Sequence, residues 1–329
     1  MNTQTLYKFS LDTSGKKIVC QSCGQRRAVR YKNNETGEFF PDNVARCDRE
    51  NSCGYHYTPK QYLTDLGAGY VPIIKKEEEY VETKIDLMPL SYVERSMNGY
   101  DKTNFANYLI DLFGFEIARK ALRKYFVGMS RNDDGTACIF WRIDEQVNLR
   151  TGKIMCYNPH TGKRNKEINP TWVHVKMKPF NYRLCFFGEH LLSEYPDATI
   201  GITESEKTAI IASIYMPEMI WIATGGNSGC KWREYDVYKV FTNRKVILFP
   251  DFGFFNKKSG KTCFDEWTER ANHIAEKIKC SIKVSSVLEN KIRPEEREND
   301  FDLADILVKR DTDTGIALSD GGYPALWDF

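Results

Sequence analysis

Four cysteines near the start of the chain have the types and spacing of metal ligands. Cys20 and Cys23 are separated by two residues in "CQSC", and Cys47 and Cys53 follow after an excursion of 23 residues. Two thiolate pairs joined by a turn-rich hairpin can complete a tetrahedral shell around one zinc ion. The segment also holds too little apolar material to fold without such a staple. We therefore expect a structural zinc ribbon over residues 1–70.

Two details of this segment stay open at the level of the sequence. His56 is an alternative to Cys53 as the fourth ligand, and four buried free thiols are the alternative to a zinc site. A basic stretch with one aromatic residue suits a nucleic-acid backbone with a stacked base, and it is equally ordinary on a solvated hairpin. The stretch comprises Arg26, Arg27, Arg30 and Lys32 around Tyr31.

Carboxylates stand where two apolar runs of the C-terminal half end. Glu204 follows "ATIGIT", and Asp251 follows "KVILFP". The carboxyl ends of parallel strands form the crevice in which open α/β sheets bind ligands. "DLADIL" supplies two further acids, Asp302 and Asp305. The alternative for Glu204 is an exposed acid that only benefits from the dipole of the following helix.

Acids at neighbouring strand ends repel one another unless a cation lies between them, and Mg²⁺ prefers carboxylate oxygens. We therefore expect Glu204 and Asp251 to hold Mg²⁺ or Mn²⁺, with Asp302 or Asp305 as a third acid at the same site. Lys207 follows Glu204 by three residues and could reach a phosphate held there. It could equally be a solvated helix residue.

A local surplus of basic residues lies in the middle of the chain. Residues 142–183 contain nine Lys or Arg against three Asp or Glu, although the net charge of the whole chain is only +2. Such a surplus predicts a surface for a polyanion. "RTGK" and "HTGKR" are turns that could present backbone N–H groups together with a cation to phosphate, or could be plain hairpin turns. The residues that we expect to contact nucleic acid or a nucleotide are Arg142, Lys153, Lys163, Arg164 and Lys207.

The elements that must position the acids are predicted by an alternation of strand and helix patterns. Apolar strand patterns cover 198–203, 219–223, 245–250 and 282–287, and helical patterns cover 205–216, 231–240 and 263–279. This alternation is typical of a parallel sheet with helices on both faces. We expect it to form one domain over residues 197–329.

The segment before this domain has a different composition. Apolar residues between 91 and 124 recur at helical spacing, which predicts two or three short helices. "TACIFWRID", "KIMCYN" and "RLCFFG" are aromatic and β-branched with turn signals between them, which predicts a meandering sheet that carries the basic surplus. The charged, proline-bounded stretch 71–90 reads as a linker, so the second domain is expected over 91–196. The whole chain is thus expected to combine α+β and α/β architecture.

Composition narrows the classes of protein further. The start of the chain lacks the apolar core of a signal peptide, and no apolar run has the length of a membrane span. We therefore expect an intracellular, cytoplasmic protein without a membrane partner, in which clustered cysteines bind metal. The helicase signature GxxxxGK[ST] is absent from the sequence, so any unwinding of nucleic acid must come from a separate helicase.

Several of these motifs together resemble a known family. "ITESEKTAIIAS", "TGG", "VILFPDFG" and "DLADIL" look like the Toprim domain shared by bacterial DNA primases, topoisomerases and some nucleases. The preceding "YFVG", "GTACIFWRID", "KIMCYNPHTGKR" and "LCFFGEHLL" resemble the N-terminal subdomain of the bacterial replicative primase core. The cysteine-rich front resembles the zinc-binding domain that precedes that core. The resemblance covers nearly the whole chain in the right order, and is greatest to primase-like Toprim proteins of bacterial mobile elements.

This resemblance implies particular roles for the acids. In the family, the first-motif glutamate and the aspartates of a DxD motif hold Mg²⁺ for nucleotidyl transfer, and these positions correspond to Glu204 and Asp251 here. Ser205 stands where the family usually has Gly, and Gly253 stands where the second Asp of DxD would be. Losing one carboxylate weakens the case for two metals, unless Asp302, Asp305 or Asp265 compensates.

The resemblance therefore implies a primase-like nucleotidyltransferase that uses single-stranded DNA and ribonucleoside triphosphates. Two alternatives remain open at this stage. One is a Toprim nuclease that uses the same acids to activate water. The other is a catalytically silent module that binds single-stranded DNA for a partner replication protein, which the missing second Asp supports. A topoisomerase is disfavoured because the chain has no room for a strand-passage gate.

Overall fold

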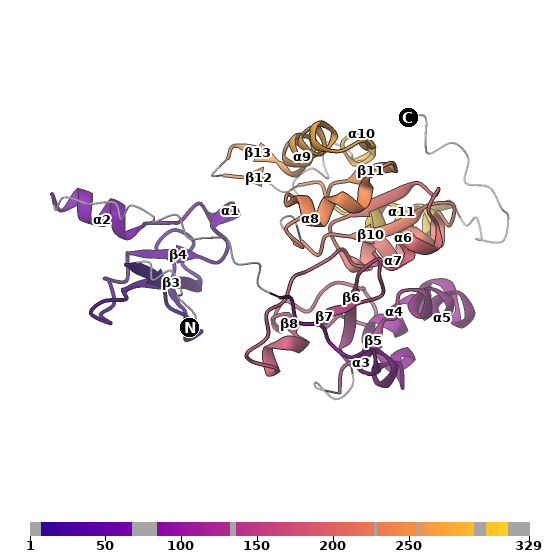
Figure 1. The fold of residues 1–329 in the computed structure, drawn as a ribbon, viewed down its shortest axis with the longest axis horizontal. Coiled ribbons are helices and arrows are strands. Elements are labelled where there is room, and N and C mark those ends of the chain that lie inside the picture. Colours follow the sequence, from indigo (N-terminus) through magenta and orange to yellow (C-terminus); the bar gives the residue numbers. More distant parts are fainter. Residues whose placement is uncertain are drawn as a thin grey trace. The chain divides into compact units, whose positions relative to one another are not determined.

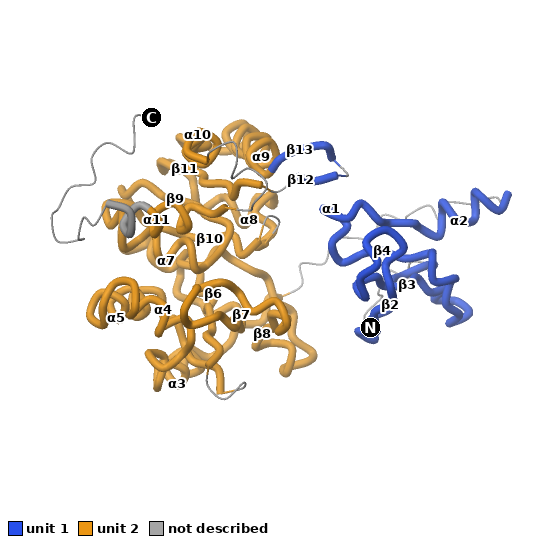
Figure 2. Tube along the Cα trace, turned by 180° about the vertical axis from the view of Figure 1, so that it is seen from behind, with its two compact units in different colours: residues 1–81, 254–262 blue, residues 82–253, 263–329 orange. Residues whose placement is uncertain are grey.

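The computed structural model describes residues 8–67, 84–131, 136–226, 229–253, 255–257, 259–292 and 301–314, with side chains to 309 in the last range. The chain divides into two compact units, 1–81 with 254–262 and 82–253 with 263–329 (Figure 2). The two domains expected over 91–196 and 197–329 thus lie in one unit. Most of the expected linker 71–90 lies outside the described residues.

The first unit is a small antiparallel sheet with a core of few and mostly small side chains, among them Val29 and Val44. Strand β3 (Arg26–Asn33) pairs with β1 (Phe9–Leu11), β2 (Ile18–Val19) and β4 (Ala45–Cys47). Its buried cluster consists of Cys20, Ala28, Ala45 and Cys47. Such a core buries little apolar surface, so the sheet needs a further crosslink.

Two helices and a hairpin complete this unit. Helix α1 (Glu50–Cys53) follows β4, and α2 (Pro59–Asp65) begins with a capping box in which Thr58 and Gln61 satisfy each other's backbone N–H groups. The hairpin β12 (Phe255–Asn256) and β13 (Lys261–Thr262) belongs to the same unit. Its Lys257 N–H donates to the Asn51 carbonyl at 2.9 Å.

The second unit begins with three short helices and a four-stranded antiparallel sheet (Figure 1). The helices are α3 (Ser91–Ser96), α4 (Asn104–Phe113) and α5 (Phe115–Lys124), with a 3₁₀ turn η1 (Tyr100–Lys102) between the first two. The strands are β5 (Gly128–Met129), β6 (Cys138–Ile143), β7 (Leu149–Met155) and β8 (Thr171–Trp172), in that order across the sheet. The helical spacing in 91–124 is confirmed.

Strand alternation gives this sheet two different faces, because successive side chains point to opposite sides. The register pairs Ile139 with Ile154 and Trp141 with Gly152 on one face. It pairs Phe140 with Lys153 and Arg142 with Thr151 on the other face. The first face belongs to the buried cluster around Trp141, and the second carries two cations.

The parallel sheet of this unit has the strand order β10-β9-β11-β14. Its strands are β9 (Ile200–Thr203), β10 (Ile220–Ala223), β11 (Lys245–Phe249) and β14 (Ser281–Val284), and every neighbouring pair is parallel. The four strand patterns in the sequence are therefore confirmed. The central strand β9 is wholly buried, as parallel strands covered on both sides are.

Two of the three helices predicted for this half are confirmed, as α7 (Glu206–Tyr215) and α9 (Cys263–Lys277). The structure adds α10 (Val287–Lys291) and α11 (Leu303–Thr314), which the sequence did not predict. The 3₁₀ turn η3 (Val173–Lys176) and the short helix α6 (Leu191–Glu194) precede the parallel sheet, and α8 (Tyr235–Tyr238) and the 3₁₀ turn η4 (Lys239–Phe241) lie between β10 and β11. The helix predicted over 231–240 is shorter, because α8 covers one turn and passes into η4. No helix in the described part of the chain is long and apolar enough to cross a membrane.

One predicted strand is wrong. "RLCFFG" is not part of the antiparallel meander, whose last strand is β8. Instead, Phe187 forms an isolated bridge with Ala223 at the end of β10. Phe186 and Phe187 are fully buried, so the aromatic run reflects burial between elements rather than strand periodicity.

Candidate functional site

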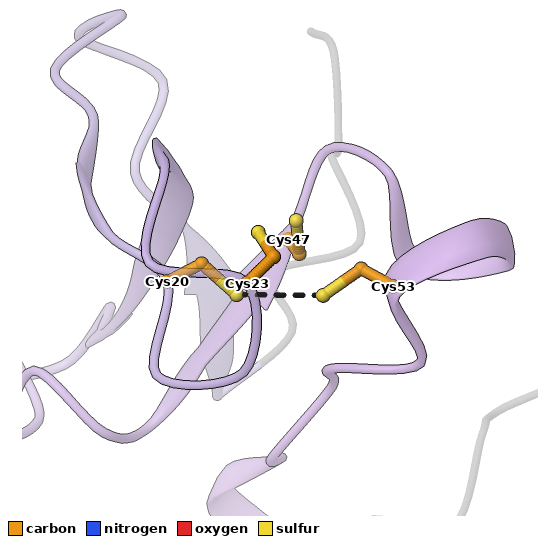
Figure 3. Close-up of side chains that lie close together, drawn as sticks. All are labelled: Cys20, Cys23, Cys47 and Cys53. Carbon is orange, nitrogen blue, oxygen red and sulfur yellow. Dashed lines mark hydrogen bonds between the residues drawn. The ribbon is translucent and has the colours of Figure 1, made fainter.

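The four cysteines of the first unit converge as predicted. Cys20 and Cys23 lie on the loop after β2, Cys47 ends β4 and Cys53 ends α1 (Figure 3). Their sulfur atoms all lie within 4.8 Å of one another, and those of Cys20 and Cys53 are 3.6 Å apart. Tetrahedral Zn–S bonds of about 2.3 Å place sulfurs roughly 3.8 Å apart, so the donor set fits one zinc ion.

The alternative ligand is excluded by its own hydrogen bonds. His56 Nε2 lies 2.7 Å from the Tyr31 hydroxyl, and His56 Nδ1 lies 2.8 Å from Glu50 Oε1. Both ring nitrogens are therefore engaged outside the cysteine cluster. At Cys53, burial raises the pKa, but hydrogen bonds from Ser22, the Tyr55 N–H and neighbouring thiols outweigh it and bring the pKa to about 7. A thiol with this pKa is readily converted to the thiolate that binds zinc.

The acids of the second unit stand at the carboxyl ends of two adjacent parallel strands. Glu204 directly follows β9, and Asp251 follows β11 after one proline. The register places Thr203 opposite Phe249, so the two strands end level with each other. The Glu204 carbonyl accepts the N–H groups of Gly225 at 2.8 Å and Gly226 at 3.1 Å, which holds the loop after β10 beside it.

Asp251 is the acid whose negative charge is least balanced by neighbouring groups. Its Oδ1 is inaccessible and has no hydrogen-bond partner among the described residues. Burial, Glu204 and Asp302 raise the pKa of Asp251 well above its usual value, and Lys207 only partly opposes them. A buried carboxylate that lacks a compensating donor costs free energy, which a cation would recover.

Asp302 and Asp305 lie beside this pair but already have partners. Asp302 Oδ1 accepts the Asp305 N–H at 2.9 Å, and Asp305 Oδ2 accepts the Asp302 N–H at 3.0 Å, which is a capping arrangement at the start of α11. Asp302 Oδ2 lies 3.2 Å from Lys207 Nζ and accepts the Thr208 hydroxyl at 2.9 Å. Burial raises the pKa of Asp302, but Lys207, the Asp305 N–H and Thr208 together hold it below its usual value.

The partners of Asp302 and Asp305 limit how these acids can bind a metal ion. Lys207 is only 13% exposed and ion-paired, so it is not a solvated helix residue. Among the described residues, one group of three or more His, Cys, Asp or Glu residues has its ligand atoms within 4.8 Å of one another. That group is the four cysteines. The acids therefore do not form a closed three-carboxylate cage. Asp265 is exposed in the first turn of α9.

Two further side chains at this site carried no signal in the sequence. Cys263 donates its thiol to Glu204 Oε2 at 3.8 Å, and burial and the charges of Glu204 and Asp251 raise its pKa. Tyr108 on α4 has its pKa raised by burial and by Asp305 and Asp302, against the influence of Lys207. Cys263 is 59 residues from Glu204, and Tyr108 lies on α4 before the antiparallel sheet. Only the tertiary structure therefore brings Cys263 to Glu204, and Tyr108 to Asp302 and Asp305.

Arg142 and Lys153 were predicted to contact nucleic acid, but both pair with Glu206 inside the second unit. Arg142 is 1% exposed and donates to Glu206, and its Nη1 donates to the Ala223 carbonyl at 3.0 Å. Lys153 Nζ lies 3.1 Å from Glu206 Oε1 and donates to the Gly225 carbonyl at 3.2 Å. Arg142 is therefore an internal ion-pair residue and cannot contact a polyanion at the surface.

Glu206 is the residue that the sequence analysis overlooked at this position. It is 1% exposed, and although burial raises its pKa, Lys153 and Arg142 outweigh burial and lower it. Gly225 is required beside it: with φ +84°, an added Cβ would lie 2.0 Å from Arg142 Nη2. The three side chains thus join the antiparallel sheet to α7 and to the loop after β10.

Other members of the basic segment divide into paired and exposed groups. Arg150 is 2.7 Å from Asp144, and Arg183 is 2.8 Å from Asp236. Lys163 and Arg164 are exposed on the "HTGKR" turn, where Gly162 lies against the Tyr108 ring. Burial and Asp302 raise the pKa of Asp305, and Lys207 and Lys163 only partly oppose them. The turn therefore places one exposed lysine near the acids.

Comparisons with known families match two parts of the chain. A zinc β-ribbon finger model matches residues 7–67, which contain all four cysteines. The model of a domain of unknown function, DUF6371, matches residues 103–252, which contain Glu204 and Asp251. No curated protein matches the chain.

Similar solved structures are DNA primases. The primase fragment of the bacteriophage T7 primase-helicase is 12% identical, covers 82% of this chain and 88% of its own, and has a TM-score of 0.34. The T7 lagging-strand polymerase complex, which contains primase domains bound to an RNA/DNA hybrid and dTTP, matches at 14% identity and TM-score 0.37, over 58% of this chain and 80% of its own. The E. coli primase catalytic core matches at 12% identity and TM-score 0.29, over 69% and 79%. The chain thus combines an N-terminal zinc ribbon with a mixed α and β unit that contains a parallel sheet.

Proposed function

We propose that the chain is a primase-like nucleotidyltransferase that acts on single-stranded DNA with ribonucleoside triphosphates. One observation carries the proposal. Glu204 and Asp251 follow β9 and β11, two neighbouring strands that end level with each other. Asp251 Oδ1 has no hydrogen-bond partner among the described residues. The parallel sheet with this acid pair and the motif order of the sequence support a Toprim domain. The proposal includes that the protein belongs to a bacterial mobile element.

The acid pair suits a divalent cation. Carboxylate oxygens are the ligands that Mg²⁺ and Mn²⁺ prefer, and Asp251 lacks the donor that would otherwise balance its charge. Glu204 and Asp251 would hold the ion, which would neutralise charge on the phosphates during transfer. Asp302 and Asp305 would remain bound to Lys207 and to the start of α11, and would shape the site electrostatically.

The remaining groups of the site would bind and orient nucleic acid. Lys163 and Arg164 are exposed on a turn near the acids, and can offer cations to a phosphate backbone. Lys153 and Arg142 would instead hold Glu206, and through it the start of α7 that follows Glu204. The zinc ribbon would supply a further surface for single-stranded DNA, and unwinding would need a separate helicase.

A direct assay tests this proposal. Purified protein is incubated with single-stranded DNA, labelled ribonucleotides and Mg²⁺ or Mn²⁺, and products are separated by length. We expect short ribonucleotide products that are absent for Glu204→Gln and present for the control Asp111→Asn, which changes an exposed acid on α4. Shortened DNA in place of new product would identify a nuclease.

A second candidate is a catalytically silent module that binds single-stranded DNA for a partner protein. It is favoured by Gly253 at the position of the second acid, and by the engagement of Asp302 with Lys207 and Thr208. In the same assay, this module would make and cleave nothing with either metal, while fluorescence anisotropy would show that it binds single-stranded DNA. That outcome would replace the first proposal.

A further inference from the structure

A cavity of about 430 Å³ lies against the antiparallel sheet of the second unit. Its floor includes Ile139, Trp141 and Ile154, which the register places on one face of β6 and β7. Phe140, Arg142 and Lys153 belong to the opposite face, which reaches Glu206 on α7. Figure 1 shows α3 and α7 on opposite sides of β6 and β7. The cavity is lined by Tyr92, Arg95 and Ser96 of α3. The cavity is therefore separate from the acids at the ends of β9 and β11.

The floor of the cavity is aromatic and rigid. Trp141 is 1% exposed and donates its indole Nε1 to Ser96 Oγ at 2.9 Å, and Ser96 Oγ donates onward to the Val93 carbonyl at 2.7 Å. Tyr92 on α3 and Trp172 on β8 also line the space. Trp141 lies beneath the surface, whereas Tyr92 and Trp172 are partly exposed and offer planar apolar contact to a flat ring.

The walls of the same cavity carry positive charge. Arg95 on α3, Arg131 after β5 and Lys176 on η3 line it, and all three are exposed. The described lining contains no Asp or Glu. Arg95 also lies 4.8 Å over the Tyr92 ring and donates Nε to the Ser91 carbonyl at 3.1 Å, which orients its guanidinium. Cations on three separate elements thus surround an apolar floor.

We propose that this cavity binds a free nucleotide, with the base against Tyr92 and Trp172 and the phosphates on Arg95, Arg131 and Lys176. Apolar and aromatic surface next to several cations suits a ligand that has a flat ring at one end and anionic oxygens at the other. The volume falls in the range of roughly 300–1,000 Å³ that small-ligand sites have. An acyl chain would not need the cations, and inorganic phosphate alone would not need the aromatic floor.

The site goes beyond the proposed transfer reaction, because it lies on the other face of the sheet and needs neither Glu204 nor Asp251. A free nucleoside triphosphate is favoured over a nucleotide within a strand. The cavity has room for a single nucleotide, and cations from three elements surround it. An oligonucleotide would instead require a groove that continues along the surface.

Binding is measured by isothermal titration of the full-length protein with each of the four ribonucleoside triphosphates, and separately with a short single-stranded oligonucleotide. Val175→Glu introduces a carboxylate at the lining, where Val175 is 46% exposed and tolerates the change. Ile168→Glu is the matched control on an exposed loop residue outside the lining, with 41% exposure. Arg95→Ala combined with Lys176→Ala removes two cations from exposed positions, and Lys120→Ala combined with Arg123→Ala on α5 is its control.

We expect nucleotide affinity to fall at least tenfold for Val175→Glu and for the Arg95 and Lys176 pair, and to stay unchanged in both controls. Asp251→Asn is expected to retain this binding whether or not the parent makes any product, so the outcome is independent of the transfer reaction. Loss of binding in Asp251→Asn would mean that the nucleotide occupies the acid site, and would overturn the proposal. It would also be overturned by no binding at millimolar nucleotide, by equal affinity in the cavity variants, or by a cavity-dependent affinity for the oligonucleotide alone.

Discussion

The Arg142 guanidinium and the Glu206 carboxylate form an ion pair in which both side chains are 1% exposed. Arg142 lies on β6 of the antiparallel sheet, and Glu206 is the first residue of α7, which follows the central strand of the parallel sheet. The pair therefore links the two sheets of the second unit next to the loop that carries Glu204. A buried ion pair specifies such a junction because loss of either partner leaves the other charge with less compensation, and here Lys153 is the second partner of Glu206.

Removal of this guanidinium should destabilise the fold strongly. We expect Arg142→Ala to lower the free energy of unfolding by up to about 3–5 kcal/mol, because Glu206 would lose one of its two cationic partners and keep only Lys153. Arg183→Ala is the control, since it breaks a more exposed pair with Asp236 and should cost less than about 1 kcal/mol. Urea titration followed by circular dichroism measures both values. Equal midpoints for the two variants would contradict a structural role for the Arg142 pair.

Two aspartates of the acid site should respond in opposite directions when their charge is removed. The pKa of Asp251 is raised in the folded chain, so its charged form opposes folding and stability falls as pH rises through that pKa. Asp251→Asn should therefore melt at the same temperature as the parent, or higher, at pH 8 without Mg²⁺. Added Mg²⁺ should stabilise the parent and leave this variant unchanged, and Glu204→Gln should behave in the same way.

Asp302→Asn is the matched comparison for that experiment. The pKa of Asp302 is held below its usual value by Lys207, so its charge stabilises the fold above the unfolded pKa. Asparagine would leave Lys207 without its partner, and we expect a loss of about 2–4 kcal/mol at pH 8. If Asp251→Asn lost as much as Asp302→Asn, the Asp251 carboxylate would be structural.

Glu189 predicts a pH dependence of stability. Burial raises its pKa to about 8, against the Phe186 N–H that donates to it at 2.9 Å. Because the folded pKa lies above the unfolded one, stability is complete below about pH 4.5 and is lost as pH rises toward 8, by up to about 1.4 kcal/mol per pH unit. Glu189→Gln keeps an oxygen for the Phe186 N–H, so it should raise the melting temperature at pH 9 more than at pH 5. A uniform shift at both pH values would show that the carboxyl does not titrate in this range.

Zinc content tests the cysteine cluster. Protein purified without chelator should contain one zinc per chain, and Cys20→Ala should lose it because three thiolates remain for a tetrahedral ion. Cys280→Ser, which changes a cysteine outside the cluster, should keep the metal. Elemental analysis of the three proteins decides the matter. Zinc retained in full by Cys20→Ala would remove the Cys₄ assignment.

The exposed turn predicts how nucleic-acid binding depends on salt. Lys163→Ala with Arg164→Ala should weaken binding of single-stranded DNA and flatten the slope of affinity against salt concentration, because fewer counterions are released. Arg150→Ala is the control, because Arg150 is already bound to Asp144. Fluorescence anisotropy over a salt series measures the slopes, and an unchanged slope for the Lys163 and Arg164 pair would place the DNA elsewhere.

The sequence by itself determined the features that depend on local pattern. The cysteine spacing predicted the metal site, because two short loops can carry all four thiols. The alternation of strand and helix predicted the parallel sheet, and with it the position of Glu204 and Asp251 at neighbouring strand ends.

Only the tertiary structure decided which charges face one another. Glu206 and Arg142 are 64 residues apart, and nothing in their local pattern distinguishes a buried pair from a solvated helix acid and a surface arginine. The same holds for the Cys263 thiol against Glu204, and for the placement of Phe187 beside Ala223 instead of in the meander. Periodicity reports which residues are buried, but the partner of a buried charge depends on how distant elements pack, which no local spacing encodes.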